Sequence, residues 1–119
     1  MKQLILLIGI LFVSSSLTNA QANCNETPPD GLSPLAAYSL FYSNYKNGDY
    51  EFALKYGKWM MCAKPEKLEG NPQFKLDTQY NRLVTIYTEV GRSKESDEAR
   101  TAYIDTALTL INEQLELFG

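Results

Sequence analysis

The chain of 119 residues contains no histidine. This absence excludes catalytic triads that depend on histidine and metal sites with imidazole ligands. A phosphate-binding glycine loop and a serine-nucleophile motif are also missing. Carboxylates are plentiful, but Glu66 and Glu69 fall in a predicted loop, and Glu95 and Glu98 at a predicted helix start. We therefore expect a protein that is not an enzyme and that uses no cofactor and no metal ion.

The chain also lacks the apolar run of ~20 residues that a transmembrane helix needs. Its apolar stretch at residues 4–13, LILLIGILFV, follows Lys2 and precedes the small residues SSSLTNA. This order is typical of a secretory signal peptide cleaved after Ala20. We predict a signal peptide at residues 1–20, export to the periplasm or the exterior of a bacterial envelope, and no membrane span after cleavage. The alternatives are an uncleaved N-terminal anchor and a lipid anchor on Cys24.

Cysteine is scarce, since only Cys24 and Cys62 occur. Their separation of 38 residues fits neither a zinc site nor a thioredoxin-type motif. In an oxidising compartment an even pair favours a disulfide. The alternative is that Cys62 is a small apolar residue buried late in a helix. Sequence cannot show whether the two sulfur atoms meet, so both interpretations stay open.

Charge of one sign is not concentrated anywhere in the sequence. The chain has 11 basic and 14 acidic residues, a net charge of −3, which becomes −4 when Lys2 is removed with the signal peptide. A mildly acidic chain without basic runs argues against a nucleic acid or an anionic membrane surface as its partner.

Turn residues divide the rest of the chain into helical stretches, and no strand is predicted. Residues 21–33 are polar and rich in proline, so we expect an irregular N-terminal segment there. Helices are predicted over residues 34–47, 49–63, 74–90 and 96–118. The boundary signals are Ser33 and Asp49 as N-caps, Gly48 and Gly91 as helix-ending turns, and Pro65 as a stop.

Apolar residues recur at helical spacing in these stretches. The first predicted face is formed by Ala37, Leu40, Phe41 and Asn44, and the second by Phe52, Ala53, Tyr56, Trp59 and Met60. The third is formed by Tyr80, Leu83, Val84 and Tyr87, and the fourth by Ala99, Tyr103, Ala107, Leu110, Ile111, Leu115 and Phe118.

The stretch YKNGDYEFALKYGKWMMCAKP, at residues 45–65, carries a recognisable pattern together with the helix before it. The matching positions are Leu40, Tyr45, Gly48, Asp49, Tyr50, Ala53 and Pro65. This pattern resembles a tetratricopeptide repeat, a pair of antiparallel helices of ~34 residues. The residue types at two of these positions have a physical reason. We expect Tyr50 to fill the space between the helices, and Ala53 to be small because the helices cross most closely there. Phe41, Asn44 and Gly57 depart from the pattern.

A second, degenerate unit follows at residues 80–106. Its matching positions are Tyr80, Leu83, Tyr87, Gly91, Ala99 and Tyr103. The resemblance implies an all-α fold with two antiparallel helix pairs, residues 34–65 and 74–119, joined by a loop at 66–73 in a right-handed superhelix. The alternative is an unrelated bundle of helical hairpins, because periodicity alone fits both.

Two helix pairs bury little apolar surface, and stacked repeats generally need three or more units. We therefore expect either the N-terminal part of a longer repeat protein or self-association through the helix at 96–118. The alternative is a small four-helix domain in which that helix folds back over the helix at 49–63.

In this family the first helix of each pair lines a concave groove, which implies a site for an unidentified protein or peptide. The groove residues expected here are Tyr38, Tyr42, Tyr45, Lys46, Asn81, Thr85 and Thr88. Tyrosine suits such surfaces because its ring is apolar and its hydroxyl forms hydrogen bonds. One alternative is that these tyrosines pack under the segment PPDGL. A different function is a structural cap or spacer with no ligand of its own.

Overall fold

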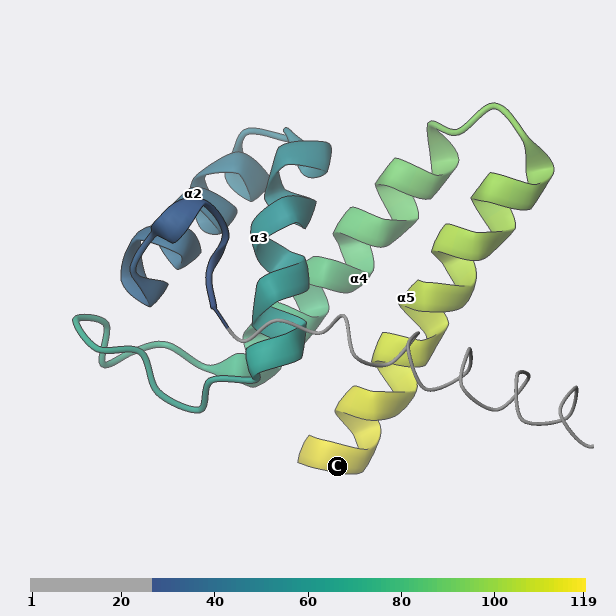
Figure 1. Ribbon diagram of the computed structural model, residues 1–119. Helices are drawn as coiled ribbons and strands as arrows, with labels where there is room; N and C mark the ends of the chain where they lie inside the picture. Colours follow the sequence, from purple (N-terminus) through teal and green to yellow (C-terminus); the bar gives the residue numbers. More distant parts are fainter. Residues whose placement is uncertain (1–26) are drawn as a thin grey trace, which may run out of the picture.

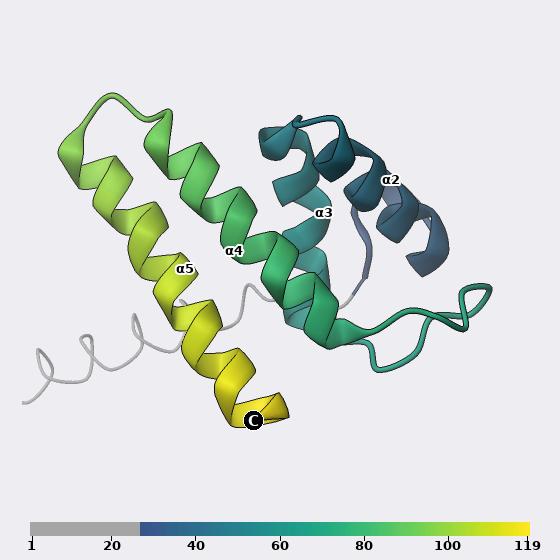
Figure 2. The ribbon, with the colours of Figure 1, turned by 180° about the vertical axis from the view of Figure 1, so that it is seen from behind.

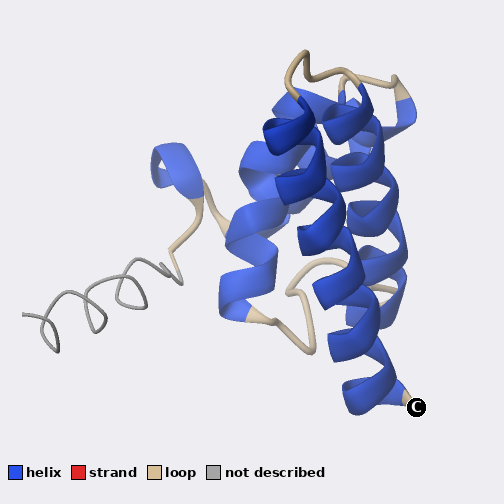
Figure 3. Ribbon diagram, turned by 90° about the vertical axis from the view of Figure 1, so that its right-hand side faces the viewer, coloured by secondary structure: helices blue, strands red, loops and turns tan. Residues whose placement is uncertain are grey.

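The computed structural model describes residues 27–119, so the predicted signal peptide at residues 1–20 lies outside the described residues. The regular elements of the described chain are all helices, which confirms the predicted all-α class (Figure 1). Its elements are η2 (Pro29–Gly31), α2 (Pro34–Lys46), α3 (Tyr50–Ala63), α4 (Leu76–Arg92) and α5 (Asp97–Phe118). Within residues 27–119 the only β-pairing is an isolated bridge between Leu68 and Asn71, and loops connect the helices (Figure 3).

The four α-helices form two hairpins, α2–α3 and α4–α5, which follow one another in space as they do in sequence (Figure 1). The hairpins join where α3 packs against α4. Seen from behind, α5 lies on the side of α4 that faces away from α2 and α3 (Figure 2). The alternative in which the last helix folds over the second helix is therefore wrong.

Cap chemistry sets the helix starts. The backbone N–H groups of Ala36 and Ala99 donate to the hydroxyls of Ser33 and Ser96, each at 3.1 Å. Asp49 precedes α3 as predicted, but its side chain makes no capping hydrogen bond. The turn before it depends on Gly48, whose φ of +80° is unfavourable for other residues.

The structure corrects the helix end that was predicted at Gly91. We expected it to end the third helix, but it lies inside α4, which continues to Arg92 and is capped by Ser93. A Cβ atom on Gly91 would lie 2.7 Å from the Cβ of Tyr103 on α5. The glycine is therefore a point of close approach between two helices, because any side chain there would force them apart.

One apolar core lies between α2, α3 and α4. Its fully buried members include Ala37, Phe41, Ala53, Met60, Tyr80, Leu83 and Ile86. Gly57 of α3 lies at the centre, since a Cβ there would lie 2.5 Å from Leu83 Cδ2 and 3.1 Å from Phe41 Cε1. The helices can pack this closely only because position 57 carries no side chain.

The predicted apolar faces were correct for most positions and wrong for some. Phe52 is 68% exposed, and Leu54, which we had not placed on the face, is buried. α3 packs against α2 and α4 along the line of Ala53, Gly57 and Met60, and this rotates Phe52 into solvent. Leu40, Ile111, Leu115 and Phe118 are also exposed.

A polar cluster attaches the end of α5 to the two preceding helices. The hydroxyl of the fully buried Tyr80 donates to Glu113, and Lys64 Nζ lies 2.9 Å from the same carboxylate. Burial, together with this hydrogen bond, raises the pKa of Tyr80 well above its usual value. Burial alone would raise the pKa of Glu113, but Tyr80 and Lys64 together lower it below that of an ordinary glutamate. Gln114 Nε2 also donates to Asp77 Oδ1 at 2.7 Å.

Candidate binding groove

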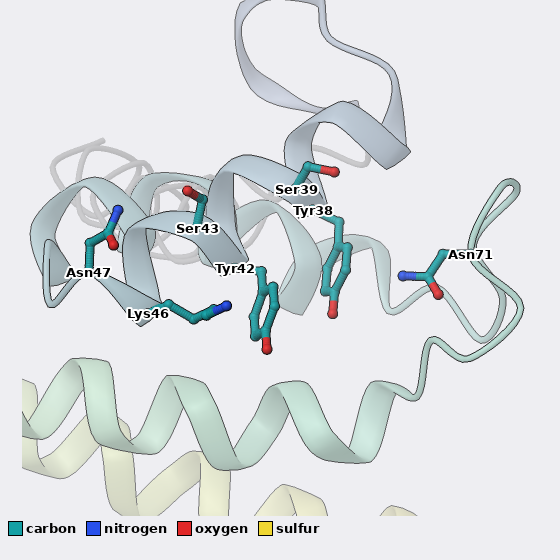
Figure 4. A pocket seen from close by; sticks show the side chains of 7 residues that line it. All are labelled: Tyr38, Ser39, Tyr42, Ser43, Lys46, Asn47 and Asn71. Atoms are coloured by element: carbon teal, nitrogen blue, oxygen red, sulfur yellow. The ribbon is translucent and has the colours of Figure 1, made fainter.

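Two tyrosines one turn apart on α2 form a parallel pair. The rings of Tyr38 and Tyr42 are inclined by 2° with centroids 6.1 Å apart, and both point from α2 toward α4 (Figure 4). Both are partly buried and pack against the core on one side. A pair of aligned rings that remains partly exposed offers a flat apolar surface with hydroxyls at its edge.

Arg82 of α4 holds this pair. Its guanidinium carbon lies 4.3 Å from the centroid of Tyr42, and its Nη1 donates to the hydroxyl of Tyr38 at 3.1 Å and to Gln79 Oε1 at 3.0 Å. Lys46 Nζ lies 5.2 Å from the same Tyr42 ring. Two cations therefore interact with one aromatic ring, an arrangement favoured by the negative charge density of the ring faces.

Beside the tyrosines lies a hollow of about 390 Å³. Its lining residues are Tyr38, Ser39, Tyr42, Ser43, Lys46, Asn47 and Asn71 (Figure 4). We call this hollow, together with Arg82, the Tyr–Arg groove. One end is formed by the loop between α3 and α4, which contributes Asn71 and places Phe74 edge-on against Tyr38 at 5.2 Å. Hydroxyls and amides thus surround the aromatic surface.

The structure brings some of the predicted groove residues together and separates others. Tyr38, Tyr42 and Lys46 share the hollow. Tyr45 does not line the hollow, and its ring is near Phe41 and Tyr50, although the Arg82 guanidinium carbon also lies 5.8 Å from its centroid.

None of the residues predicted on α4 lines the hollow. Asn81 accepts a hydrogen bond from Gln114 of α5 at 2.8 Å, so it faces α5 rather than α2. Thr85 and Thr88 donate their hydroxyl hydrogens to carbonyls of their own helix. Each helical residue is rotated by about 100° from its neighbour. This rotation turns Arg82 toward α2 and Asn81 toward α5, so Asn81 does not lie beside the tyrosines.

Sequence reasoning missed the polar half of the groove. Ser39 and Ser43 of α2 and the C-cap residue Asn47 recur at intervals of four residues beside the tyrosine row, and that spacing places them on one face. Arg82 could have been singled out from the sequence, because it is the only basic residue between Lys75 and Arg92. Asn71 carried no signal, because its place depends on the path of a loop.

The PPDGL segment does not cover these tyrosines as the alternative required. Its helical turn η2 packs against α3. Asp30 accepts a hydrogen bond from Lys55 Nζ at 2.8 Å, which raises the pKa of Lys55. The described part of this segment therefore leaves the Tyr–Arg groove open.

The described residues also form other hollows, including one of about 490 Å³ in the loop between α3 and α4, lined by Lys67, Leu68, Glu69, Asn71, Pro72 and Phe74. Among residues 27–119 no group of three or more cysteine, aspartate or glutamate side chains is placed to hold a metal ion, and no helix has the length and apolar character of a membrane span. Cys62 lies partly buried near the end of α3. Its expected disulfide partner, Cys24, lies outside the described residues, so that pairing stays a prediction.

The sequence was also compared with known proteins. No family model matches it, and neither the curated proteins nor the solved structures contain a match.

Proposed function

We propose that this chain is an exported, tetratricopeptide-like module that binds a protein or peptide segment in the Tyr–Arg groove. The residues that resemble the repeat pattern place α2 and α4 as the first helices of two successive pairs, and first helices line the groove in such repeats. The groove residues come mainly from α2, with Arg82 from α4 beside them. We propose the periplasm or the exterior of a bacterial envelope as its location.

The observation that carries this proposal is the partial exposure of the Tyr38–Tyr42 pair beside a polar-rimmed hollow. Tyrosine loses little conformational entropy on binding and presents a large apolar surface, so it is enriched among residues that dominate binding energy. Serine and asparagine on the rim can hydrogen-bond a peptide backbone, which is needed when an extended segment is desolvated. The groove thus has the composition of a peptide-binding surface.

A second candidate function is a structural cap or spacer, and one observation favours it. α5 exposes Ile104, Leu108, Ile111, Leu115 and Phe118, which follow one another at intervals of four and three residues along one face. This spacing suits another helix packed alongside, either from further repeats or from a second copy of the chain. In that role the module would contribute through α5, and the Tyr–Arg groove would have no ligand.

A double substitution distinguishes the two functions. We expect Tyr38→Ala with Tyr42→Ala to abolish binding of peptides selected by the wild-type chain from a random displayed library. Tyr56→Ala is the matched control, because Tyr56 is also a partly buried tyrosine but lies on α3, outside the groove. Chemical denaturation of each variant reports its fold separately. Retained binding in the double variant, or a library that yields no binder, contradicts the proposed function.

A further inference from the structure

Arg82 and Lys46 form no ion pair within residues 27–119, as is also true of Lys58, Lys67 and Lys75, but only these two lie together against the ring of Tyr42. The ion pairs within residues 27–119 involve Lys55, Lys64, Arg92, Lys94 and Arg100. Neither Arg82 nor Lys46 forms one in this range, although the chain has more acidic than basic residues. Both cations interact with the Tyr42 ring instead. The groove therefore holds positive charge that no described carboxylate balances.

The lining of the hollow strengthens this local charge. It contains one lysine and no aspartate or glutamate, and its other members are tyrosines, serines and asparagines. Concave surfaces with low-dielectric walls focus the field of the charges that line them. The Tyr–Arg groove is thus a positive surface on a molecule whose net charge is −3.

Arg82 is also held in place and retains donors for a ligand. Its two hydrogen bonds within the described chain both use Nη1. A guanidinium carries five N–H donors in a rigid plane, so Nε and Nη2 keep three of them. This fork matches the two oxygens of a carboxylate, and a side chain already fixed by stacking loses little entropy on binding.

From this geometry we propose that the groove selects peptide segments that carry an aspartate or glutamate side chain. The carboxylate pairs with Arg82 and Lys46, while the neighbouring part of the peptide lies on the rings of Tyr38 and Tyr42. Ser39, Ser43 and Asn47 form the rim available to the peptide backbone. This inference rests on the proposed function and adds the charge of the partner. A basic segment is disfavoured, because it would bring like charges together in a partly dehydrated site.

The test compares two peptides on the wild-type chain. Peptides are first selected from a random displayed library, and the tightest binder is then synthesised together with a copy in which each glutamate or aspartate is replaced by its amide. We expect acidic residues to be enriched by the selection. We also expect the amide copy to bind at least about tenfold more weakly at low salt, with the difference shrinking as salt screens the charges.

Two double variants locate the effect. Lys46→Gln with Arg82→Gln should bind the acidic peptide and its amide copy with equal, low affinity. Lys58→Gln with Arg92→Gln makes the same change in net charge outside the groove and should behave like the wild type, because Arg92 is an exposed residue on the same helix as Arg82. The acidic peptide and its amide copy are also compared on the wild-type chain, so the preference is tested even if Lys46→Gln with Arg82→Gln fails to fold.

The outcomes separate this inference from the function on which it rests. Equal affinity of the acidic peptide and its amide copy for the wild-type chain, with binding still lost in the Tyr38→Ala, Tyr42→Ala variant, overturns the acidic preference and leaves the proposed function standing. Enrichment of neutral or basic peptides has the same meaning. A selection that yields no binder overturns both.

Discussion

The two hairpins are held together by different forces. In α2–α3 the contacts are apolar, with Phe41, Ala53 and Met60 fully buried around Gly57. In the second hairpin, α4 buries Leu76, Gln79, Tyr80, Leu83, Ile86, Val90 and Gly91, whereas the longer α5 buries only Ala107 and Leu110. Much of what attaches α5 is polar, through Glu113 and Gln114.

This difference teaches where the stability of the molecule lies. Burial of apolar surface is the dominant favourable term in folding, so α2, α3 and α4 form the stable unit. Partly exposed hydrogen bonds and ion pairs contribute much less. We therefore expect α5 to separate from α4 under conditions in which the other three helices remain packed.

The largest effect is expected for Leu83→Ala. Leu83 is fully buried between α3 and α4, so the substitution removes apolar contacts and leaves a cavity that costs ~2–5 kcal/mol of unfolding free energy. Leu108→Ala deletes the same atoms from α5, where the side chain is 53% exposed, and should change stability by less than ~0.5 kcal/mol. Urea denaturation measures both. Similar losses in the two variants would contradict the comparison between the hairpins.

The next effect is expected at the points of close approach. Gly57→Leu places a side chain against Leu83 and Phe41, and overpacking of this kind costs ~1–3 kcal/mol. Ala102→Leu, at an exposed position of α5, is the control for added volume on a helix. An unchanged denaturation midpoint for Gly57→Leu would show that the helices cross elsewhere.

Gly91→Leu sharpens the comparison, because the atoms nearest to a Cβ there belong to Tyr103 and Arg100, both of α5. We expect faster hydrogen exchange confined to α5 and the adjacent face of α4. Faster exchange throughout α2 and α3 as well would show that all the helices unfold as one unit.

A smaller effect depends on pH. Because the folded pKa of Glu113 lies below the unfolded value of ~4.3, its carboxylate contributes stability above that value, and the contribution is lost as the pH falls through the folded pKa. Glu113 is about one-third exposed, so we expect Glu113→Gln to cost about 1 kcal/mol or less near neutral pH.

The measurement is the difference in unfolding free energy between the wild type and Glu113→Gln across the acidic range. This difference should shrink as the pH falls below the unfolded value of ~4.3 and through the lower folded pKa, because Glu113 becomes protonated there. Glu116→Gln, which removes an exposed carboxylate of the same helix, is the control. A constant difference would mean that the cluster with Tyr80 and Lys64 does not depend on the charge of Glu113.

The smallest effect is expected on the exposed face of α5. Leu115 is 60% exposed, so Leu115→Ser should alter the unfolding free energy by less than ~0.5 kcal/mol, whereas Leu110→Ser, at a buried position, should cost several times more. A loss above 1 kcal/mol for Leu115→Ser that grows with protein concentration would indicate that this face is covered by a second copy.

Local chemistry determined most of the secondary structure. Ser33, Gly48 and Pro65 act on their immediate neighbours through capping, a positive φ and a missing N–H, so their effects could be read without knowing the fold. The tyrosine row on α2 could be predicted for the same reason, since residues one turn apart share a helical face.

Packing between helices decided the rest. Gly91 is the residue type that commonly ends a helix, but it lies inside α4. The contact with Tyr103 of α5, which no local pattern predicts, is what requires a small residue at this position. Phe52 fits the apolar period of α3, yet the directions from which α2 and α4 approach decide which side is buried. Arg82 and Asn71 reach the tyrosines through contacts far apart in sequence, and the energy of such contacts depends on a three-dimensional arrangement that no local pattern encodes.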